Sequence, residues 1–406
     1  MTTDISVARR YGIKKSIYTA LWFMFLTFPI MVIKVNTVDN IIIWRWENMF
    51  LIGAGSFILS FIWPYMMLRK ERESENEIGI LQTLSKTIKS KKKIYLSLII
   101  AASAFVVAFP FIFSMYNANI MTTALIYVML GLGLNIVVGI SGQLFLGYAA
   151  FYAAGAYTYA LLNHHFAINF WVALPIGGVM GALIGILLGF PVLRLKGDYL
   201  AIVTLGFGEI VRLVLENWND FSFGPSGIAN IPRPPLFNIK LPLHEATVYL
   251  YFIMVILCIF TVFIIRRLED SRIGRALVAL REDETACQAM GIDKTKIKLT
   301  AFALGTTWAG MGGVLFAAKT TFINPSSFTI WESIIVLCIV VLGGMGSIVG
   351  VIVGAMTLIL LPEYLRAFSE YRMIIFGVVL VLMMIFRPGG IVTAARKNYT
   401  FKSESK

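Results

Sequence analysis

Residues 170–190 read FWVALPIGGVMGALIGILLGF and contain no charged side chain. A helix crosses the hydrocarbon core of a bilayer, about 30 Å thick, with about 20 apolar residues. Backbone amides in lipid must be paired within the structure, so the stretch predicts a membrane-spanning helix. Similar runs recur near 17–33, 49–68, 94–114, 119–139, 143–162, 199–216, 247–265, 298–318, 331–342, 347–361 and 372–386. They predict an all-α polytopic membrane protein with about 10–12 transmembrane helices, some broken or re-entrant.

The composition favours the same fold class. Hydrophobic residues make up 58% of the 406 residues and charged residues 14%, and the mean hydropathy is +0.80. Soluble domains carry about 25% charged residues. The composition therefore excludes a soluble multi-domain enzyme, although the length alone would suit one.

The net charge of +13 is distributed in a way that indicates topology. If the N-terminus is cytoplasmic, most of the 35 Lys and Arg residues fall in cytoplasmic stretches. The opposite side then holds Lys34, Arg45, Arg233, Lys240, Lys319, Arg366 and Arg372. This bias follows the positive-inside rule and predicts that both termini are cytoplasmic. Nucleic-acid binding is not favoured, because no single basic face collects the charge.

The largest change in composition lies between residues 69 and 93, which are rich in Lys, Arg and Glu. It predicts a domain boundary. Residues 1–93 are expected to form a two-helix extension with a charged cytoplasmic linker. Residues 94–395 are expected to form a glycine-rich transmembrane core, and residues 396–406 a cytoplasmic tail.

Glycine is spaced regularly within this core. Two triplets recur at every fourth residue, namely Gly181, Gly185, Gly189 and Gly346, Gly350, Gly354. Small residues at i and i+4 give a smooth helix face on which two backbones can approach closely in lipid. Both triplets therefore predict helix-packing faces. Their common spacing indicates an internally duplicated core, the usual construction of transporters, or a coincidence among many glycines.

Two segments are poor continuous helices. Residues 139–157, GISGQLFLGYAAFYAAGAY, carry four glycines, and segment 331–342 is short and ends at a Gly-Gly pair. Irregular backbone in a membrane is tolerated where it lines a cavity or packs within protein. Segments 143–162 and 331–342 are therefore candidates for re-entrant structure. A translocation path is predicted at Asn135, Gln143, Tyr148, Glu209 and Arg212.

Glu209 and Arg212 stand three residues apart inside the apolar segment 199–216, so they share one helix face. They are expected to pair, because an unpaired charge in lipid is costly. The pair is either structural, packed between helices, or a substrate contact. Its neutral net charge argues against a proton relay.

The sequence contains few candidates for catalytic residues. Histidine occurs at His164, His165 and His244, all in predicted outer loops. The sequence contains no metal-binding, nucleophile-elbow or phosphate-loop motif. Without a phosphate loop, ATP hydrolysis by this chain is not expected. No catalytic residue, metal ligand or bound cofactor is assigned. Cys258, Cys287 and Cys338 do not form a disulfide framework and are predicted to be packing residues. An intramembrane enzyme is the minor alternative.

The long predicted cytoplasmic loop 266–298 contains an amphipathic stretch. Ile273, Leu277 and Leu280 follow i, i+4, i+7 on one helix face, and a charged end from Arg281 to Glu284 follows. Such a helix is solvated, lies on lipid, or docks into a partner. Consecutive acidic residues argue against anionic lipid, so docking to a partner protein is favoured.

Several stretches of this sequence resemble a known family. They are GLGLNIVVGISGQLFLGYAAFYAAGAY (131–157), FPVLRLKGDYLAIVTLGFGEIVR (190–212), ALREDETACQAMG (279–291), VLGGMGS (341–347) and IFRPGGI (385–391). In this order they closely resemble LivM-type permeases, the membrane subunits of ABC importers for branched-chain amino acids. The two-helix extension is similar to the longer LivM form. Related urea and amide permeases share the core.

The resemblance implies a heteromeric importer in the bacterial cytoplasmic (inner) membrane. A LivH-like sister permease, two cytoplasmic ATPases of the LivG and LivF type that hold ATP and Mg²⁺, and a periplasmic or lipid-anchored amino-acid-binding protein are the implied partners. The coupling signature E-A-A-x-x-x-G is matched by Thr285-Ala286-Cys287-x-x-x-Gly291, without its glutamate. We therefore expect a non-enzymatic permease subunit for Leu, Ile and Val, with Ile273, Leu277, Leu280, Arg281, Glu284 and Gly291 in ATPase coupling. The alternative is an ion- or proton-coupled secondary transporter, or an ABC permease for urea or amides.

Overall fold

The computed structural model describes residues 15–28, 32–36, 41–47, 49–58, 60, 104–192, 195, 197–235, 242–368 and single positions between 374 and 392. The chain divides into two compact units, Met1–Ala102 and Ser103–Lys406. The predicted domain boundary at residue 93 and the predicted tail 396–406 lie outside the described residues.

The first unit contains helices at 15–28 and 49–58. Between them lies an antiparallel hairpin of β1 (Ile33–Asn36) and β2 (Ile41–Trp44), in the register Ile33 to Trp44. The rings of Trp44 and Trp46 stack just after the hairpin, with centroids 5.7 Å apart. This hairpin was not predicted from the sequence.

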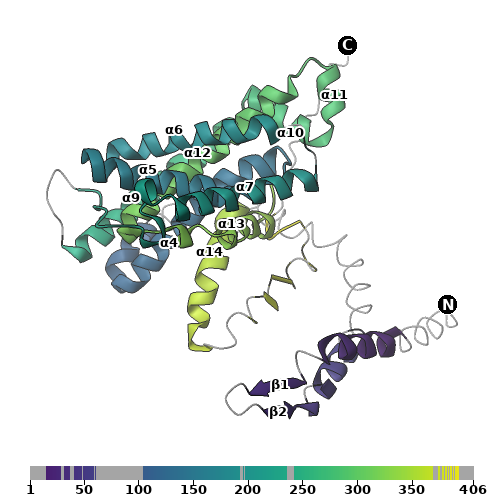
Figure 1. Ribbon diagram of the computed structural model, residues 1–406. Coiled ribbons are helices and arrows are strands. Elements are labelled where there is room, and N and C mark those ends of the chain that lie inside the picture. Colours follow the sequence, from purple (N-terminus) through teal and green to yellow (C-terminus); the bar gives the residue numbers. More distant parts are fainter. Residues whose placement is uncertain are drawn as a thin grey trace. The chain divides into compact units, whose positions relative to one another are not determined.

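The second unit is a bundle of long helices with short connections (Figure 1). A helix at 104–112 comes first. It is followed by α4 (Met115–Asn135), the π-helix η1 (Ile136–Ile140), α5 (Tyr148–Phe166), α6 (Phe170–Val192), α7 (Asp198–Asn217), α8 (Asn219–Ser222), η2 (Gly224–Ser226), β3 (Ile228–Ala229), α9 (Leu243–Glu269), α10 (Arg272–Glu282), α11 (Glu284–Ala289), α12 (Lys294–Thr320), β4 (Phe322–Ile323), η3 (Pro325–Ser327), α13 (Ile330–Gly343), α14 (Ile348–Tyr364) and η4 (Leu365–Phe368). Strands β3 and β4 pair antiparallel and join two loops.

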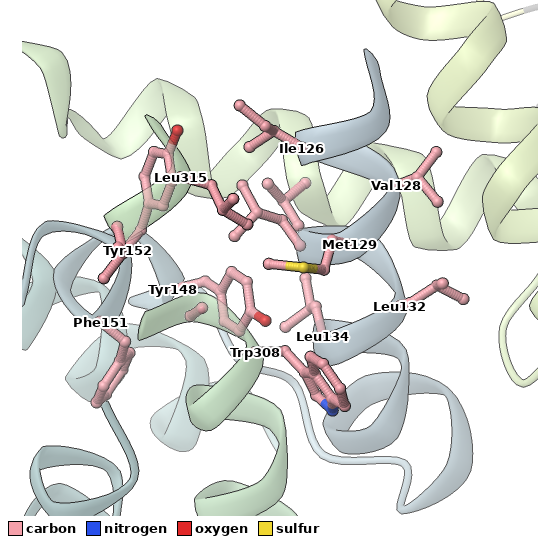
Figure 2. Packing of buried hydrophobic residues seen from close by; sticks show 14 of the residues in the cluster. Ile126, Val128, Met129, Leu132, Leu134, Tyr148, Phe151, Tyr152, Trp308 and Leu315 are labelled. Carbon is pink, nitrogen blue, oxygen red and sulfur yellow. The ribbon is translucent and has the colours of Figure 1, made fainter. Parts of the chain in front are cut away.

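Helix α4 and its extension η1 run through the centre of this bundle. Along its most apolar stretch this helix is 89% buried, against 44% for α6 and 39% for α9. Figure 2 shows its side chains, such as Met129 and Leu134, packed against Tyr148 of α5 and Trp308 of α12. A helix that is apolar on all sides is expected at such a central position. The outer helices expose apolar residues, for example Leu187 at 73%, as a surface facing lipid requires.

Helices α5, α6 and α12 pack with their backbones in close contact at glycine residues. A Cβ on Gly155 of α5 would lie 1.9 Å from the carbonyl oxygen of Gly310 on α12, and one on Gly310 would lie 2.1 Å from the carbonyl oxygen of Gly177 on α6. A side chain at any of these positions would push two helices apart. Small residues therefore set the close packing of these three helices.

The first predicted glycine triplet lies on α6 and faces α12. A Cβ on Gly181 or Gly185 would overlap Thr306, and one on Gly189 would touch Leu299 at 3.0 Å. These contacts are of the kind that the spacing predicted.

In the second triplet, Gly350 and Gly354 lie on α14 and face Gly343 of α13. The expected helical position of Gly346 is wrong. It lies in the turn before α14 with φ +82°, a left-handed conformation that favours glycine and ends a helix face. If the two glycine triplets are aligned, the continuous helix α6 corresponds to α13, the turn after it and α14. The internal duplication therefore stays a prediction.

Five helices in the described part of the chain are long and apolar enough to cross a membrane, namely Met115–Ile140, Phe170–Val192, Leu243–Glu269, Lys294–Thr320 and Pro325–Gly343. Met49–Ile58 and Ile348–Tyr364 are shorter apolar helices. The predicted all-α polytopic membrane fold is confirmed. The total of about 10–12 spans and their re-entrant members stay predictions, since most of residues 61–103 and 369–392 lies outside the described residues.

Candidate functional site: the α10–α11 segment and the interior beneath it

The loop predicted to couple to a partner forms two short helices, α10 and α11, at one end of the bundle (Figure 1). Side-chain caps fix where they and α12 begin. The Ser271 hydroxyl accepts a bond from the first turn of α10 at 3.1 Å. Asp283 accepts from the backbone N–H groups of Thr285 at 2.7 Å and Ala286 at 3.0 Å, and Asp293 caps α12 in the same way. The bonds from Ala286 and Thr285 hold the pKa of Asp283 below its usual range.

The apolar face of α10 is covered by the chain itself. Leu277 is 0% exposed and Leu280 is 3% exposed, and Leu277 belongs to the main hydrophobic core. The expectation that these two side chains insert into an ATPase is therefore wrong. Ile273 lies on the same side of the helix as Leu277 but one turn nearer its start, where it is exposed at 40%. The solvent-facing side carries Val278, exposed at 48%. An amphipathic pattern identifies an apolar face but not the body that covers it.

Polar contacts also tie this segment to the membrane helices. Arg281 Nη1 donates to the carbonyl oxygen of Gly139 in η1 at 2.6 Å. Glu284 forms an ion pair with Lys298 of α12, whose side chain is 7% exposed. Gly291 is exposed in a left-handed turn with φ +80° after α11. Of the predicted coupling residues, Leu277, Leu280, Arg281 and Glu284 pack on or bond to other parts of this chain. Ile273, Arg281 and Gly291 are exposed.

The predicted translocation residues Asn135, Gln143 and Tyr148 lie deep in the bundle, at exposures of 0%, 6% and 1%. Asn135 Oδ1 accepts from the backbone N–H of Gly346 at 2.8 Å. The Tyr148 hydroxyl donates to the carbonyl oxygen of Gly305 at 2.9 Å. Asn135 and Gln143 flank η1, whereas Tyr148 joins α5 to α12. Their part in a translocation path stays a prediction.

Glu209 and Arg212 lie on α7, away from η1, and form the expected ion pair at 2.5 Å. Glu216 completes a triad, because Arg212 Nη1 also reaches its carboxylate at 2.6 Å. The i, i+4 spacing of Glu216 could have revealed it. The three side chains are 21% to 38% exposed, so the triad is partly open on the surface of this single chain.

Two further polar contacts lie inside the candidate spans. Tyr127 of α4 hydrogen-bonds to Glu332 of α13, and Lys319 of α12 hydrogen-bonds to Thr123 of α4. Lys319 was predicted to lie on the outer side, beyond the apolar run 298–318, and Glu332 was not predicted to have a role. Its position inside an apolar run could have revealed it.

The cysteines and acidic groups suggest no metal centre in the described part of the chain. Cys258 and Cys287 are buried and Cys338 is half-buried, all as free thiols. Among the described residues, no group of three or more His, Cys, Asp or Glu side chains is placed to hold a metal ion.

Comparison with known proteins gives a consistent assignment. Residues 116–385 match the family model described as branched-chain amino acid transport system / permease component. The chain is 44% identical over 379 residues to the high-affinity branched-chain amino acid transport system permease protein LivM of Salmonella typhimurium, and equally to that of Escherichia coli, covering 88% of each chain. It is 24% identical over 304 residues to the LivH permease protein of Escherichia coli, covering 70% of this chain and 95% of that one. No solved structure gives a significant match. This chain belongs to the branched-chain amino acid transport system permease family.

Proposed function

We propose that this chain is a transmembrane permease subunit of an ABC importer that moves leucine, isoleucine and valine into the cytoplasm. ATP is hydrolysed on partner subunits, and a second, LivH-like permease completes the pathway. Support comes from the family, from the 44% identity to two LivM permeases, and from the apolar helices long enough to span a membrane.

One observation carries the proposal. The α10–α11 segment packs on the membrane helices through Leu277, Arg281 and Glu284, yet it still exposes apolar side chains at Val278 and Met290 (48% and 82%). A protein that binds the exposed side chains of this segment would move α10 and α11, and their contacts would transmit that movement to η1 and α12. A secondary transporter that works alone needs no such element. We place the ATPase contact on this exposed face, in place of Leu277 and Leu280.

The proposal is tested by uptake in cells. Cells that express this chain with its sister permease, two ATPases and a binding protein should accumulate labelled leucine, and omission of the ATPases should abolish accumulation. A protonophore should have little effect while ATP is maintained. Uptake that survives without the ATPases and collapses with the protonophore would instead establish a secondary transporter. Competition by valine but not by urea separates the amino-acid substrate from amides.

We further propose that the α10–α11 segment and both termini face the cytoplasm of the inner membrane. In a Cys338→Ala background, His165→Cys should label with an impermeant thiol reagent from outside, because His165 is exposed and lies in a predicted outer loop. Lys296→Cys, at a side chain 83% exposed in the first turn of α12, should label only after the cells are opened. The reverse pattern would invert the orientation.

A further inference from the structure

Arg281 makes an unusual contact for a residue in a surface helix. Its guanidinium reaches from α10 to the carbonyl oxygen of Gly139 inside η1, at 2.6 Å. Its stem lies across Gly142, where an added Cβ would be 2.6 Å from Arg281 Cγ. Gly142 has φ +72°, so both the backbone turn and the missing side chain make room for this arginine. A charged donor to a backbone carbonyl is among the stronger hydrogen bonds.

The acceptor lies in an element with a special geometry. Residues 136–140 form a π-helix at the end of α4, and π-turns are rare and concentrate at functional sites. A Cβ on Gly139 would lie 1.9 Å from Asn135 Oδ1 and 2.5 Å from the backbone nitrogen of Gly346. Asn135 Oδ1 accepts from that nitrogen at 2.8 Å. The residue whose carbonyl Arg281 holds therefore lies directly against the hydrogen bond between α4 and the α13–α14 turn, with no room for a side chain.

Two buried polar atoms beside η1 lack hydrogen-bond partners. These are Asn135 Nδ2 and Gln143 Oε1, on side chains 0% and 6% exposed. A buried donor or acceptor left unpaired raises the free energy of the state that contains it. These two atoms beside η1 therefore have hydrogen-bonding capacity that the contacts within this chain do not use.

We propose that Arg281 is a positioning residue that transmits movement of α10 to η1, and through Asn135 to the α13–α14 turn. When α10 moves, the Arg281 hydrogen bond displaces the Gly139 carbonyl and with it η1. This displacement strains the hydrogen bond between Asn135 and Gly346, and so changes the packing of α4 against α14. The inference rests on the proposed function, since an ATPase must be what moves α10. The leucines of α10 and the pair Glu284–Lys298 hold the segment in place; Arg281 links it to the π-helix.

The test uses the complete reconstituted complex of both permeases, both ATPases and the binding protein. The measured quantity is the ratio of leucine imported to ATP hydrolysed. Arg281→Ala should assemble with the ATPases and keep hydrolysis within about twofold of wild type, while the ratio falls about tenfold, which corresponds to about 1.4 kcal/mol. Arg281→Lys should recover part of the ratio, because an ammonium can donate to the same carbonyl.

Arg275→Ala is the matched control. It removes an arginine from the same helix that also donates to a backbone carbonyl, that of Asp270 at 2.7 Å, but this carbonyl lies in the connecting turn and not in a membrane helix. Its ratio should stay at the wild-type value. If Arg281→Ala prevents assembly, Arg281→Gln takes its place, since it keeps part of the stem but is too short to reach Gly139.

A second variant tests the link through Asn135. Asn135→Ala should also lower the ratio, and the double variant with Arg281→Ala should be no worse than the more severe single variant, because both changes interrupt one chain of contacts. Multiplying effects would contradict the proposal, as would a wild-type ratio in Arg281→Ala or a parallel loss of hydrolysis and uptake. A wild-type complex without ATP-dependent leucine uptake would instead refute the proposed function itself, and this inference with it.

Discussion

Replacing Gly155 with alanine is expected to prevent the protein from accumulating as a folded bundle. The added Cβ would lie 1.9 Å from the carbonyl oxygen and 2.5 Å from the carbonyl carbon of Gly310. These are backbone atoms of α12, so no side-chain rotation relieves the overlap, and α5 and α12 must separate. Overpacking a well-packed core costs about 1–3 kcal/mol even where side chains can yield, and folded proteins have about 5–15 kcal/mol in total.

The measurement is the amount of monodisperse protein extracted in detergent and its thermal unfolding midpoint. Gly206→Ala serves as the matched control, because Gly206 lies on α7 with no heavy atom within 4 Å of its added Cβ. It should extract and unfold like the wild type. Equal behaviour of the two variants would mean that α5 and α12 do not approach at these glycines.

Placing aspartate on the two faces of α10 should give opposite results. Leu277→Asp inserts a carboxylate at a position that is 0% exposed, and an unpaired buried charge costs several kcal/mol. The protein should therefore misfold or fail to accumulate. Val278→Asp, one residue later and 48% exposed, should accumulate normally but lose ATPase co-purification, because the charge falls on the proposed contact face.

Membrane protein yield and recovery of the ATPases on the purified permease are read out together for the pair. Normal yield of Leu277→Asp would show that α10 does not pack on the core as described. Full ATPase recovery with Val278→Asp would exclude that face as the docking surface.

Much of the fold follows from the sequence because the bilayer restricts the possibilities. Uncharged runs such as 170–190 must become helices, and α6 spans Phe170–Val192. The glycine spacing on α6 correctly indicated a packing face, since periodicity places residues on one side of a helix. What periodicity does not contain is the backbone conformation at a turn, so Gly346 was assigned to a helix although its φ of +82° ends that face. The short strands β1 to β4 carried no pattern long enough to detect.

The candidate site was harder to predict than the fold. The stripe through Leu277 and Leu280 identified an amphipathic helix, but a covering surface from this chain and one from a partner produce the same stripe. Local partners were predictable, and Glu209 pairs with Arg212 because they are neighbours on one helix. Contacts between distant elements, such as Arg281 with Gly139 or Tyr127 with Glu332, depend on tertiary packing that a single sequence does not display.

The most direct test of the account measures labelled leucine inside proteoliposomes that hold the purified permease pair, the ATPases and the binding protein, with no ion gradient across the membrane. ATP supplied on the ATPase side should drive leucine to an internal concentration well above the external one. ATP with an ATPase that cannot hydrolyse it should give no accumulation. Accumulation driven by an imposed proton or sodium gradient in the absence of ATP would contradict the claim that this chain is a permease subunit powered by partner ATPases.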